Sequence, residues 1–212
     1  MGTPLLVLGT RTLAVEIADI ASEAGFEIAG FVENMEPERC SEGLEGLPVH
    51  WVDDVAGLAA THLAVAGLAT TRRSVFVHQV VAFGLRFATV IHPTARVSTK
   101  STVGEGSIVS VGAVVAAKTT IGRHVLLNRG ALIGHHTEIG DFVSIQPGAN
   151  VAGACSIGVA AFVGMGALVL DHLTVGPGSI VGAGAVVTKD VPASVQVVGV
   201  PARIVRKGVE SR

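Results

Sequence analysis

The chain has 212 residues, of which 49% are hydrophobic and 4% are aromatic, and its formal net charge is −2. A chain of this length forms one large domain or two small ones, and the weak net charge without a basic stripe argues against a nucleic-acid-binding protein. Every apolar run is shorter than the ~18 residues of a membrane-spanning helix, which argues against an integral membrane protein.

The first residues and the two cysteines indicate the cellular compartment of the protein. The apolar run 5–8 is short and has no basic flank, so we expect no signal peptide. Cys40 and Cys155 provide no disulfide framework. These features together predict a protein of the reducing cytoplasm.

Residues 1–90 alternate between strand-like and helix-like patterns. Pro4–Leu8 is an apolar run ending at Gly9, and apolar residues at helical spacing follow from Thr12 until Gly25 supplies a stop. Further strands are predicted at 26–32, 48–51, 62–66 and 87–91. Asp53 is expected to cap a weak helix that reaches residue 60. A helix at 71–83 has an apolar side that we expect to consist of Val75, Val77, Val80, Val81 and Phe83. This alternation predicts a small open parallel sheet.

A ligand on such a sheet binds at the carboxyl ends of the strands, here near Gly9, Glu33 and Gly67. The turn Gly9–Thr12 begins a helix, whose N-terminus attracts phosphate. It holds a single glycine and does not match G-x-G-x-x-G. A phosphate site and an ordinary strand-to-helix turn therefore both stay open.

Residues 91–188 repeat every six residues. An aliphatic side chain opens each of seventeen hexads without insertion, the fifth place is mostly small, and glycine recurs at the second place. This pattern is the hexapeptide repeat of a parallel β-helix, in which three hexads make one triangular coil. The first and fifth side chains are expected to point inward, Ile91 included. We expect the second-place glycines to serve corners that need a positive φ.

Two adjacent histidines lie at outward places of this repeat. His135 is third and His136 fourth in their hexad, with Asn128 seven residues before and Asp141 shortly after. Neutral imidazole is the usual general base near pH 7. The alternative is that both are solvated turn residues, but the polar residues around them favour a site.

The chain resembles the left-handed β-helix sugar acyltransferases, in particular the bacterial nucleotide-amino-sugar N-acetyltransferases and the so-called sialic acid O-acetyltransferases. The resemblance covers nearly the whole chain and includes the N-terminal α/β region. It is carried by Asn128, Ile133-Gly134-His135-His136, Phe162-Val163-Gly164-Met165-Gly166-Ala167, Gly182–Pro192 and Gly199-Val200-Pro201-Ala202-Arg203.

The resemblance implies a homotrimer with active sites between neighbouring left-handed β-helices, and no metal. It implies acetyl transfer from acetyl-CoA to an amino or hydroxyl group of a nucleotide-linked sugar. The implied domains are 1–90 for the nucleotide sugar, 91–192 for acyl-CoA and catalysis, and 193–212 as a tail. His135 would be the general base, with His136 and Asn128 in the catalytic site. Acetyl-CoA would contact Ser144, Gly153, Gly164, Met165, Gly182, Ala183, Pro201 and Arg203. The nucleotide sugar would contact Gly9, Thr10, Thr12, Glu33, Asn34 and Gly67.

The chain departs from the family pattern around these sites. His136 stands where the family usually carries Asp or Glu, and Ser144 stands in place of a second histidine. The N-terminal turn has Thr12-Leu13-Ala14 instead of a glycine-rich ending, and Glu33-Asn34 replaces an acidic pair. A carboxylate after the base would orient it and raise its basicity, which a neutral imidazole does less well.

Other interpretations stay open at this point. A metal-dependent hydratase resembling the γ-class carbonic anhydrases would use His136 and His172, two coils apart, but its third ligand position is Pro177, which cannot bind zinc. A β-helix without the partner carboxylate would also suit a non-catalytic binding module. The C-terminal cluster Arg203, Arg206 and Lys207 would bind the 3′-phosphate of CoA or form a solvated charged end. The identity of the sugar and the choice between N- and O-acylation are not determined.

Overall fold

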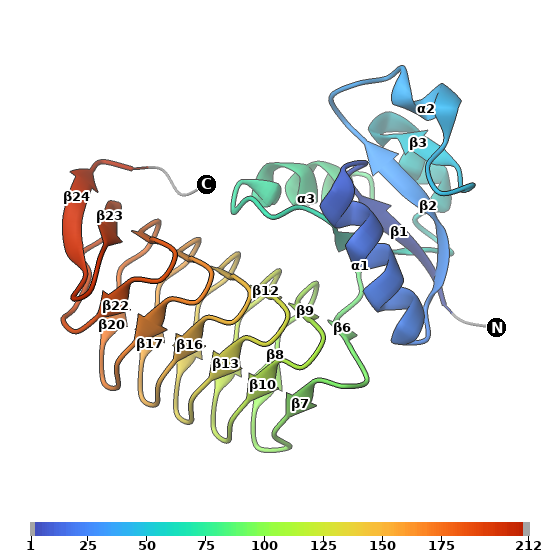
Figure 1. The fold of residues 1–212 in the computed structure, drawn as a ribbon. Helices are drawn as coiled ribbons and strands as arrows, with labels where there is room; N and C mark the ends of the chain where they lie inside the picture. Colours follow the sequence, from blue (N-terminus) through green and yellow to red (C-terminus); the bar gives the residue numbers. More distant parts are fainter. Residues whose placement is uncertain (1–2, 210–212) are drawn as a thin grey trace. The chain divides into compact units, whose positions relative to one another are not determined.

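The computed structural model describes residues 3–209. The chain divides into two compact units. The first contains the residues up to Ala69 together with Arg73–Pro93, and the second contains Thr70–Arg72 together with the residues from Thr94 onward. The first unit contains a five-stranded sheet, and the second contains the stacked short strands of three further sheets (Figure 1).

The first unit is built on a parallel five-stranded sheet. Its strands are β1 (Pro4–Leu8), β2 (Glu27–Glu33), β3 (Val49–Trp51), β4 (Leu63–Ala66) and β5 (Arg86–Phe87). They lie in the order β3-β2-β1-β4-β5, and every pair is parallel. The central strand β1 is the most apolar, and Leu5–Leu8 is fully buried. The predicted open parallel sheet is therefore confirmed.

The helices of this unit connect the strands. They are α1 (Thr12–Glu23), α2 (Arg39–Glu42), the 3₁₀ helix η1 (Val52–Leu58) and α3 (Arg73–Ala82). The predicted stop after α1 is confirmed, because Gly25 has φ of +90° and its N–H donates to the Ser22 carbonyl at 3.0 Å. A left-handed residue with such a bond is a common helix ending.

Three local predictions in the first unit are wrong. Asp53 does not cap a helix; it lies inside η1 and accepts a hydrogen bond from the Trp51 indole at 3.1 Å. On α3, Val75 is 70% and Val81 is 49% exposed, while Phe76, Val77 and Val80 form the buried side. The apolar residues there are nearly continuous, so their spacing does not define one face. The strand expected at 87–91 is two strands, β5 and β6 (Val90–Ile91).

The second unit contains strands of two residues each. Its first sheet contains β7 (Arg96–Val97), β10 (Val114–Val115), β13 (Leu132–Ile133), β16 (Asn150–Val151), β19 (Leu168–Val169) and β22 (Val186–Val187). Its second sheet contains β8 (Thr102–Val103), β11 (Thr120–Ile121), β14 (Glu138–Ile139), β17 (Ser156–Ile157) and β20 (Thr174–Val175). Its third sheet includes β9 (Ile108–Val109), β12 (Leu126–Leu127), β15 (Ser144–Ile145), β18 (Phe162–Val163) and β21 (Ile180–Val181).

These strands stack into the coils of a parallel β-helix (Figure 1). Strands inside the stack pair with the strands eighteen residues before and after them, as Ile133 pairs with Val115 and Val151. One coil therefore consists of three hexads, as the repeat predicts. A turn at the end of each strand leads the chain from one sheet to the next.

The interior of the β-helix follows the hexad register. From Val109 to Val187, every first-place side chain is at most 3% exposed. The fifth-place hydroxyls are also satisfied: Ser107 Oγ donates to the Gly122 carbonyl at 2.8 Å and accepts from the Val125 N–H at 2.9 Å. Ile91 precedes the first complete coil and is 39% exposed, so the prediction that it points into a core is wrong.

The second-place glycines have a different role from the one predicted. The positive φ angles of the coils occur at the fourth place, where non-glycine residues such as His136 and Ala160 adopt them as well. A Cβ on the second-place glycine Gly158 would lie 2.5 Å from Pro177 N, and on Gly164 it would lie 2.6 Å from Ala183 N. Glycine is needed at these places because the backbone of the next coil passes so closely.

Gly158→Ala is therefore expected to destabilise the β-helix by about 1–3 kcal/mol, the usual cost of overpacking. Its matched control is Gly166→Ala at a fourth place, where no atom lies within 4 Å of the added Cβ. Alanine already occupies that conformation at Ala160, with φ of 55°. Urea unfolding of both variants shows which one loses more stability. An equal or larger loss of stability in Gly166→Ala would contradict this role of Gly158.

The C-terminal residues form a hairpin on the last coil. β23 (Val195–Val198) pairs in parallel with β21, and β24 (Arg203–Lys207) pairs antiparallel with β23. Val195 and Val197 are 5% and 3% exposed and belong to the core of the β-helix. The hairpin therefore covers apolar side chains that the last coil would otherwise leave open.

Candidate functional site

The two histidines lie at one corner of the β-helix. The turn from β13 to β14 contains both, and both side chains are exposed. We call the turns from the first to the second sheet the histidine corner (residues 134–136, 152–154 and 170–172). His136 has φ of 56°, as the fourth place of other coils does, and its N–H donates to the Ala117 carbonyl at 3.1 Å. The corner therefore holds both side chains on a regular backbone.

The ring of His135 rests on the next coil at Gly153. A Cβ on Gly153 would lie 2.8 Å from Cε1 and 2.9 Å from Nε2 of His135. Gly153 has an ordinary φ angle, so glycine is needed here for the ring and not for the turn. The structure thus gives Gly153 a role that the sequence did not indicate, which is to seat the imidazole of His135.

His135 and His136 also contact each other. Their Nδ1 atoms are 3.0 Å apart, within hydrogen-bond distance, and the two rings stand at 89° with centroids 5.1 Å apart. The Nε2 atom of His135 is not part of this contact. An exposed imidazole held in this way has the position and chemistry of a general base.

Asn128 lies at a different corner of the coil. It precedes β13 and His135 follows β13, so one side of the triangle separates them. Asn128 is 6% exposed, and its Oδ1 accepts the Arg129 N–H at 2.8 Å. We call the turns from the third to the first sheet the glycine corner (residues 128–130, 146–148, 164–166 and 182–184). The structure therefore does not bring Asn128 and His135 together within one chain.

The predicted acetyl-CoA residues divide between the two corners. Gly164, Met165, Gly182 and Ala183 share the glycine corner with Asn128, whereas Gly153 belongs to the histidine corner. Met165 is 58% exposed, but Gly164 is buried beneath the backbone of Ala183. Ser144 opens β15 and is fully buried.

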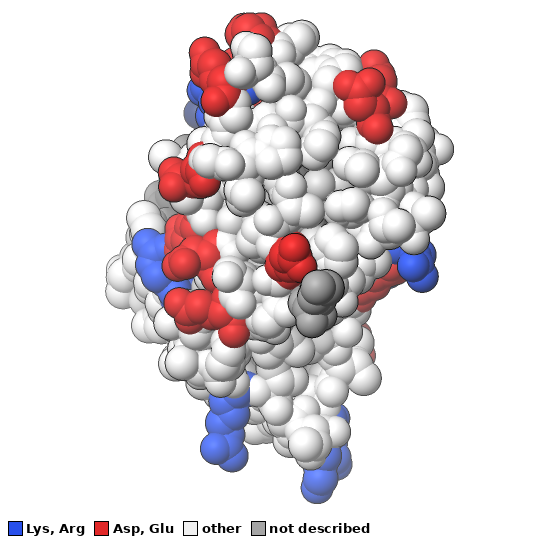
Figure 2. All heavy atoms as spheres, turned by 90° about the vertical axis from the view of Figure 1, so that its right-hand side faces the viewer, with Lys and Arg blue, Asp and Glu red and all other residues white. Residues whose placement is uncertain are grey.

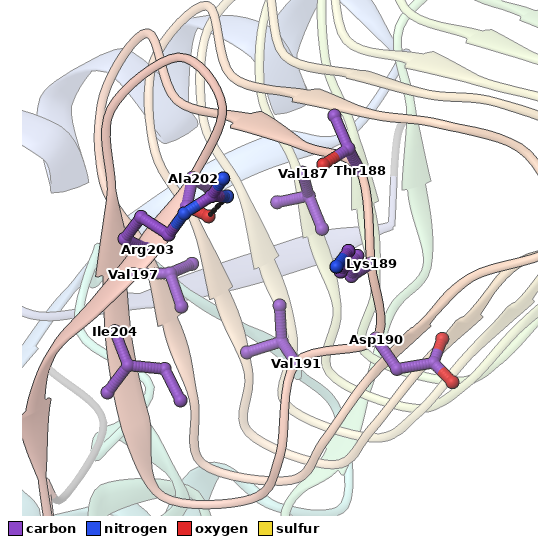
Figure 3. A pocket seen from close by; sticks show the side chains of 9 residues that line it. All are labelled: Val187, Thr188, Lys189, Asp190, Val191, Val197, Ala202, Arg203 and Ile204. Atoms are coloured by element: carbon purple, nitrogen blue, oxygen red, sulfur yellow. Dashed lines mark hydrogen bonds between the residues drawn. The ribbon is translucent and has the colours of Figure 1, made fainter.

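A cavity of about 390 Å³ lies between the last coil and the C-terminal hairpin (Figure 3). It is lined by Lys189, Asp190 and Arg203 together with apolar side chains such as Val187 and Val197. Arg203 donates to the Ala202 carbonyl at 2.8 Å, and Pro201 is exposed on the connection before it. The structure therefore puts the predicted residue Arg203 at the same cavity as a second cation, Lys189, that the sequence did not single out.

In the first unit, the predicted sugar-binding residues gather at the carboxyl ends of the strands. Thr10 donates a short hydrogen bond to Glu33, and both are buried. Glu33 Oε1 also accepts the N–H groups of Asn34 and Met35 at 2.9 and 2.8 Å. Gly9 N–H donates to the Val32 carbonyl at 2.8 Å. One oxygen of Glu33 thus holds the turn after β2, and the other binds Thr10 in the turn after β1.

The other residues predicted to bind the nucleotide sugar each have different surroundings. Thr12 is exposed and opens α1, which has no side-chain cap. Asn34 donates from Nδ2 to Gln79 on α3 at 3.0 Å. A Cβ on Gly67 would lie 2.7 Å from Ala14 Cα, so glycine is needed there for the close packing of α1.

A cluster of charges that the sequence did not indicate lies beside this turn. Glu36 forms ion pairs with both Arg11 and Arg39. Arg39 also donates to the Thr10 carbonyl at 3.2 Å. The three side chains are 25 and 3 residues apart in sequence, and only the fold brings Arg11 to the other two. Two cations thus lie at the N-terminal end of α1, where the helix dipole also favours an anion.

The carboxyl of Glu33 should make the first unit sensitive to acid. Burial opposes its ionisation, but the hydrogen bonds from Thr10 and the backbone hold its pKa below the ordinary 4.5. A carboxyl with a lowered pKa stabilises the fold above its unfolded pKa, and this stability is lost as the pH falls through the folded value. The contribution is therefore complete above about pH 4.5 and disappears below it.

We expect Glu33→Gln to lower the stability of the first unit at pH 7 by about 1–3 kcal/mol, because a hydrogen-bonded buried charge is lost. The difference from the native chain should shrink as the pH falls below 4.5. Trp51, the single tryptophan, pairs with Glu33 across β2 and β3 and reports the unfolding in urea by fluorescence. Glu27→Gln, on the same strand but exposed, is the control. A constant difference from pH 7 to 3 would contradict this account.

The described residues offer no three-ligand cluster for a metal. Among residues 3–209, no group of three or more His, Cys, Asp or Glu side chains is placed to hold an ion. His172 occupies the same hexad place as His136 and lies near Asp171, with Nε2 and Oδ2 3.7 Å apart. Pro177 belongs to a different corner of the coil. The hydratase alternative thus gains no support from the geometry.

On the face shown in Figure 2, Lys and Arg side chains lie in small separate groups, several of them beside Asp or Glu. Within the part of the chain that the structure describes, no helix has the length and apolar character that crossing a membrane requires.

Comparison with known proteins identifies similar solved structures. No family model and no curated protein sequence matches the chain. A histidine-to-asparagine variant of perosamine N-acetyltransferase from Caulobacter crescentus, in complex with CoA and GDP-perosamine, is 30% identical with a TM-score of 0.88, over 95% of this chain and 96% of that chain. The acetyltransferase domain of PglB from Neisseria gonorrhoeae is 28% identical with a TM-score of 0.88, over 96% of this chain and 100% of that chain. WeeI from Acinetobacter baumannii is 28% identical with a TM-score of 0.85, over 95% and 99%.

Proposed function

The chain belongs to the hexapeptide-repeat sugar acetyltransferases, and on this premise we propose that it acetylates the amino group of a nucleotide-linked sugar. It is an acetyl-CoA-dependent sugar acetyltransferase built on a left-handed parallel β-helix. An amino acceptor is supported by the similarity to the N-acetyltransferase in complex with CoA and GDP-perosamine.

The observation that carries the proposal is the seat of His135. Its ring is exposed at the corner, rests on Gly153 and keeps Nε2 outside the contact with His136. A base must be both held and accessible, and this side chain combines the two properties. Variants of the perosamine enzyme that lack one histidine were studied in complex with both ligands, which agrees with a role for histidine in such enzymes.

In the proposed reaction, His135 takes a proton from the sugar amine while the nitrogen attacks the thioester carbonyl. An N–C bond forms and the C–S bond of acetyl-CoA breaks. The leaving thiolate then receives the proton that His135 holds, so an amide and CoA with a free thiol result. Backbone N–H groups near the corner would stabilise the charge on the carbonyl oxygen.

The two corners carry different parts of the proposed site. Asn128, Met165 and Ala183 lie at the glycine corner, and His135 lies at the histidine corner. Between them the first sheet presents Leu132 and Leu168, 41% and 40% exposed. They flank Asn150 on the strand between them, and exposed apolar side chains on one face favour contact with another protein surface. We therefore propose a homotrimer in which the histidine corner of one chain faces the glycine corner of its neighbour, with Gly153, Gly164, Gly182, Pro201 and Arg203 contributing to acetyl-CoA binding. Ser144 is buried and would contribute only by supporting the coil beneath that surface.

The acceptor nucleotide is proposed to bind at the carboxyl ends of β1, β2 and β4. Arg11 and Arg39 are held there by the carboxylate of Glu36, and a phosphate group would compete with that carboxylate. The uncapped N-terminus of α1 adds N–H donors. Glu33 would then act by shaping the turn, because both of its oxygens are already engaged. The proposed contacts are Gly9, Thr10, Thr12, Glu33, Asn34 and Gly67.

The function is tested by supplying acetyl-CoA with a panel of GDP- and UDP-linked amino sugars and their hydroxyl counterparts. Release of the CoA thiol and a mass gain of one acetyl group on an amino sugar are the expected results. Modification of only the hydroxyl compounds would make the enzyme an O-acetyltransferase. Binding of acetyl-CoA without turnover of any sugar would favour the non-catalytic interpretation.

The shared site is tested by mixing two inactive variants, His135→Ala and Asn128→Ala. If a site takes His135 from one chain and Asn128 from its neighbour, random mixed trimers contain intact sites, about a quarter of the total at equal amounts. Activity should then appear on unfolding and refolding the variants together, but not separately. A mixture that forms trimers and stays inactive would show that no site combines His135 of one chain with Asn128 of its neighbour. The cytoplasmic location stays a prediction from the cysteines.

A further inference from the structure

The contact between His135 and His136 constrains where their hydrogens lie. Their Nδ1 atoms are 3.0 Å apart, and two lone pairs do not face each other at that distance. One of the two nitrogens therefore carries a hydrogen and the other accepts it. A neutral imidazole carries one hydrogen on its two nitrogens. The direction of this bond therefore decides whether each Nε2 atom carries a hydrogen or has a free lone pair.

The two directions have opposite consequences for the reaction. If His135 donates from Nδ1, its Nε2 has a free lone pair and can take a proton. If His136 donates, Nε2 of His135 carries the hydrogen and cannot act as a base. Only the first direction is compatible with His135 as the general base.

The contacts around His135 and His136 hold the two side chains in one arrangement relative to each other. The ring of His135 is held against Gly153, and the backbone of His136 is fixed by φ of 56° and by its bond to Ala117. The rings stand nearly perpendicular, at 89°. The other titratable groups of the histidine corner are Asp171 and His172, two coils after the pair, while Lys118 lies at the equivalent turn one coil before and Glu138 lies on the outer face of β14. More distant turns of the same kind carry Lys100, Lys189 and Asp190.

We propose that His136 is a positioning residue that accepts the Nδ1–H of His135 and so keeps Nε2 of His135 unprotonated. This inference rests on the proposed function, in which His135 is the base. When His135 takes the proton of the amine, its Nδ1–H becomes a charged donor, and hydrogen bonds from charged donors are stronger than neutral ones. His136 thus supplies the acceptor that a carboxylate supplies elsewhere in the family, without its negative charge.

Two variants separate this role from a structural one. His136→Asn keeps an acceptor oxygen near Nδ1 of His135, and asparagine tolerates the left-handed backbone of this position. His136→Gly removes the acceptor and adopts the same backbone without a steric cost. Neither change is expected to disturb the coil, and thermal unfolding of both variants verifies this.

The first measurement is the tautomer of His135, read from nitrogen NMR of the protein with labelled histidine. Hydrogen on Nδ1 of His135 is expected in the native chain and in His136→Asn. In His136→Gly the hydrogen should move toward Nε2, the form that free histidine prefers in water. Hydrogen on Nε2 in the native chain would overturn the proposal, because His136 would then be the donor.

The second measurement is turnover with the acceptor sugar. His136→Gly should lower kcat at least about tenfold, since a base in the wrong tautomer cannot take the proton, and it should leave KM for acetyl-CoA unchanged. His136→Asn should recover most of kcat. Full activity of His136→Gly would overturn the proposal and leave the proposed function standing. If the tautomer of His135 depends on His136 but the protein acetylates no sugar, the proposed role of His136 would stand and the proposed acetyltransferase function would be rejected.

Discussion

Replacing His135 with alanine is expected to lower kcat for acetyl transfer by about 10²–10⁴, the usual contribution of a positioned general base. The side chain is exposed and makes no contact in the core, so the fold should be unaffected. Binding of acetyl-CoA should also persist, because, of the residues proposed to bind it, only Gly153 is known to contact the His135 ring. Initial rates at saturating acetyl-CoA and sugar, with calorimetric binding of CoA, separate the two effects.

The matched control is His172→Ala. This histidine is also exposed, lies at the histidine corner two coils later and occupies the same hexad place as His136. Its loss should leave the rate within about twofold of the native enzyme, as expected for a surface residue outside the site. An equal loss of rate in both variants would indicate that any substitution at the histidine corner slows the reaction. Full activity of His135→Ala would mean that another residue is the general base.

Ile145→Ala should produce the largest loss of stability. The side chain is fully buried, and its strand β15 pairs with β12 on one side and β18 on the other. Truncation removes contacts with Leu127 and Val163 and leaves a cavity that a stacked array cannot close. The expected cost is about 2–5 kcal/mol, measured by denaturant unfolding followed by circular dichroism.

Val159→Ala provides the comparison for this loss. Val159 lies at a turn of the same β-helix and is 51% exposed, so its truncation should change stability by less than about 0.5 kcal/mol. Both variants must be compared at one protein concentration, because association of chains raises apparent stability. Equal melting of Ile145→Ala and the native chain would contradict the hexad register.

The sequence predicted the interior of the β-helix well because its register is redundant. Each coil repeats the same inward place, so a residue such as Ile145 is identified by its equivalents Leu127 and Val163. The turns were predicted less well. The sequence shows where glycine occurs, but not whether glycine is needed for a positive φ, as at Gly166, or for space, as at Gly158.

For the candidate site too, the sequence predicted where a residue lies in the repeat but not which residues it contacts. The outward place of His135 follows from the register, and the resemblance to a known family singled it out. The seat on Gly153 and the contact with His136 depend on how neighbouring coils pack, which a one-dimensional pattern does not contain. Arg11 and Glu36 were missed for a related reason, because residues 25 positions apart carry no local signal of their contact.

By itself, the sequence determined that this chain has a small parallel α/β region and a long hexapeptide β-helix, since both follow from local periodicity. The register also marked the outward pair His135 and His136 as a candidate site, and the family resemblance selected His135 of the two. Only the tertiary structure decided that Asn128 and His135 lie at opposite ends of one coil side, and that the Nδ1 atoms of the two histidines come within hydrogen-bond distance. Distances between side chains depend on the packing of coil on coil, and packing is a property of three dimensions.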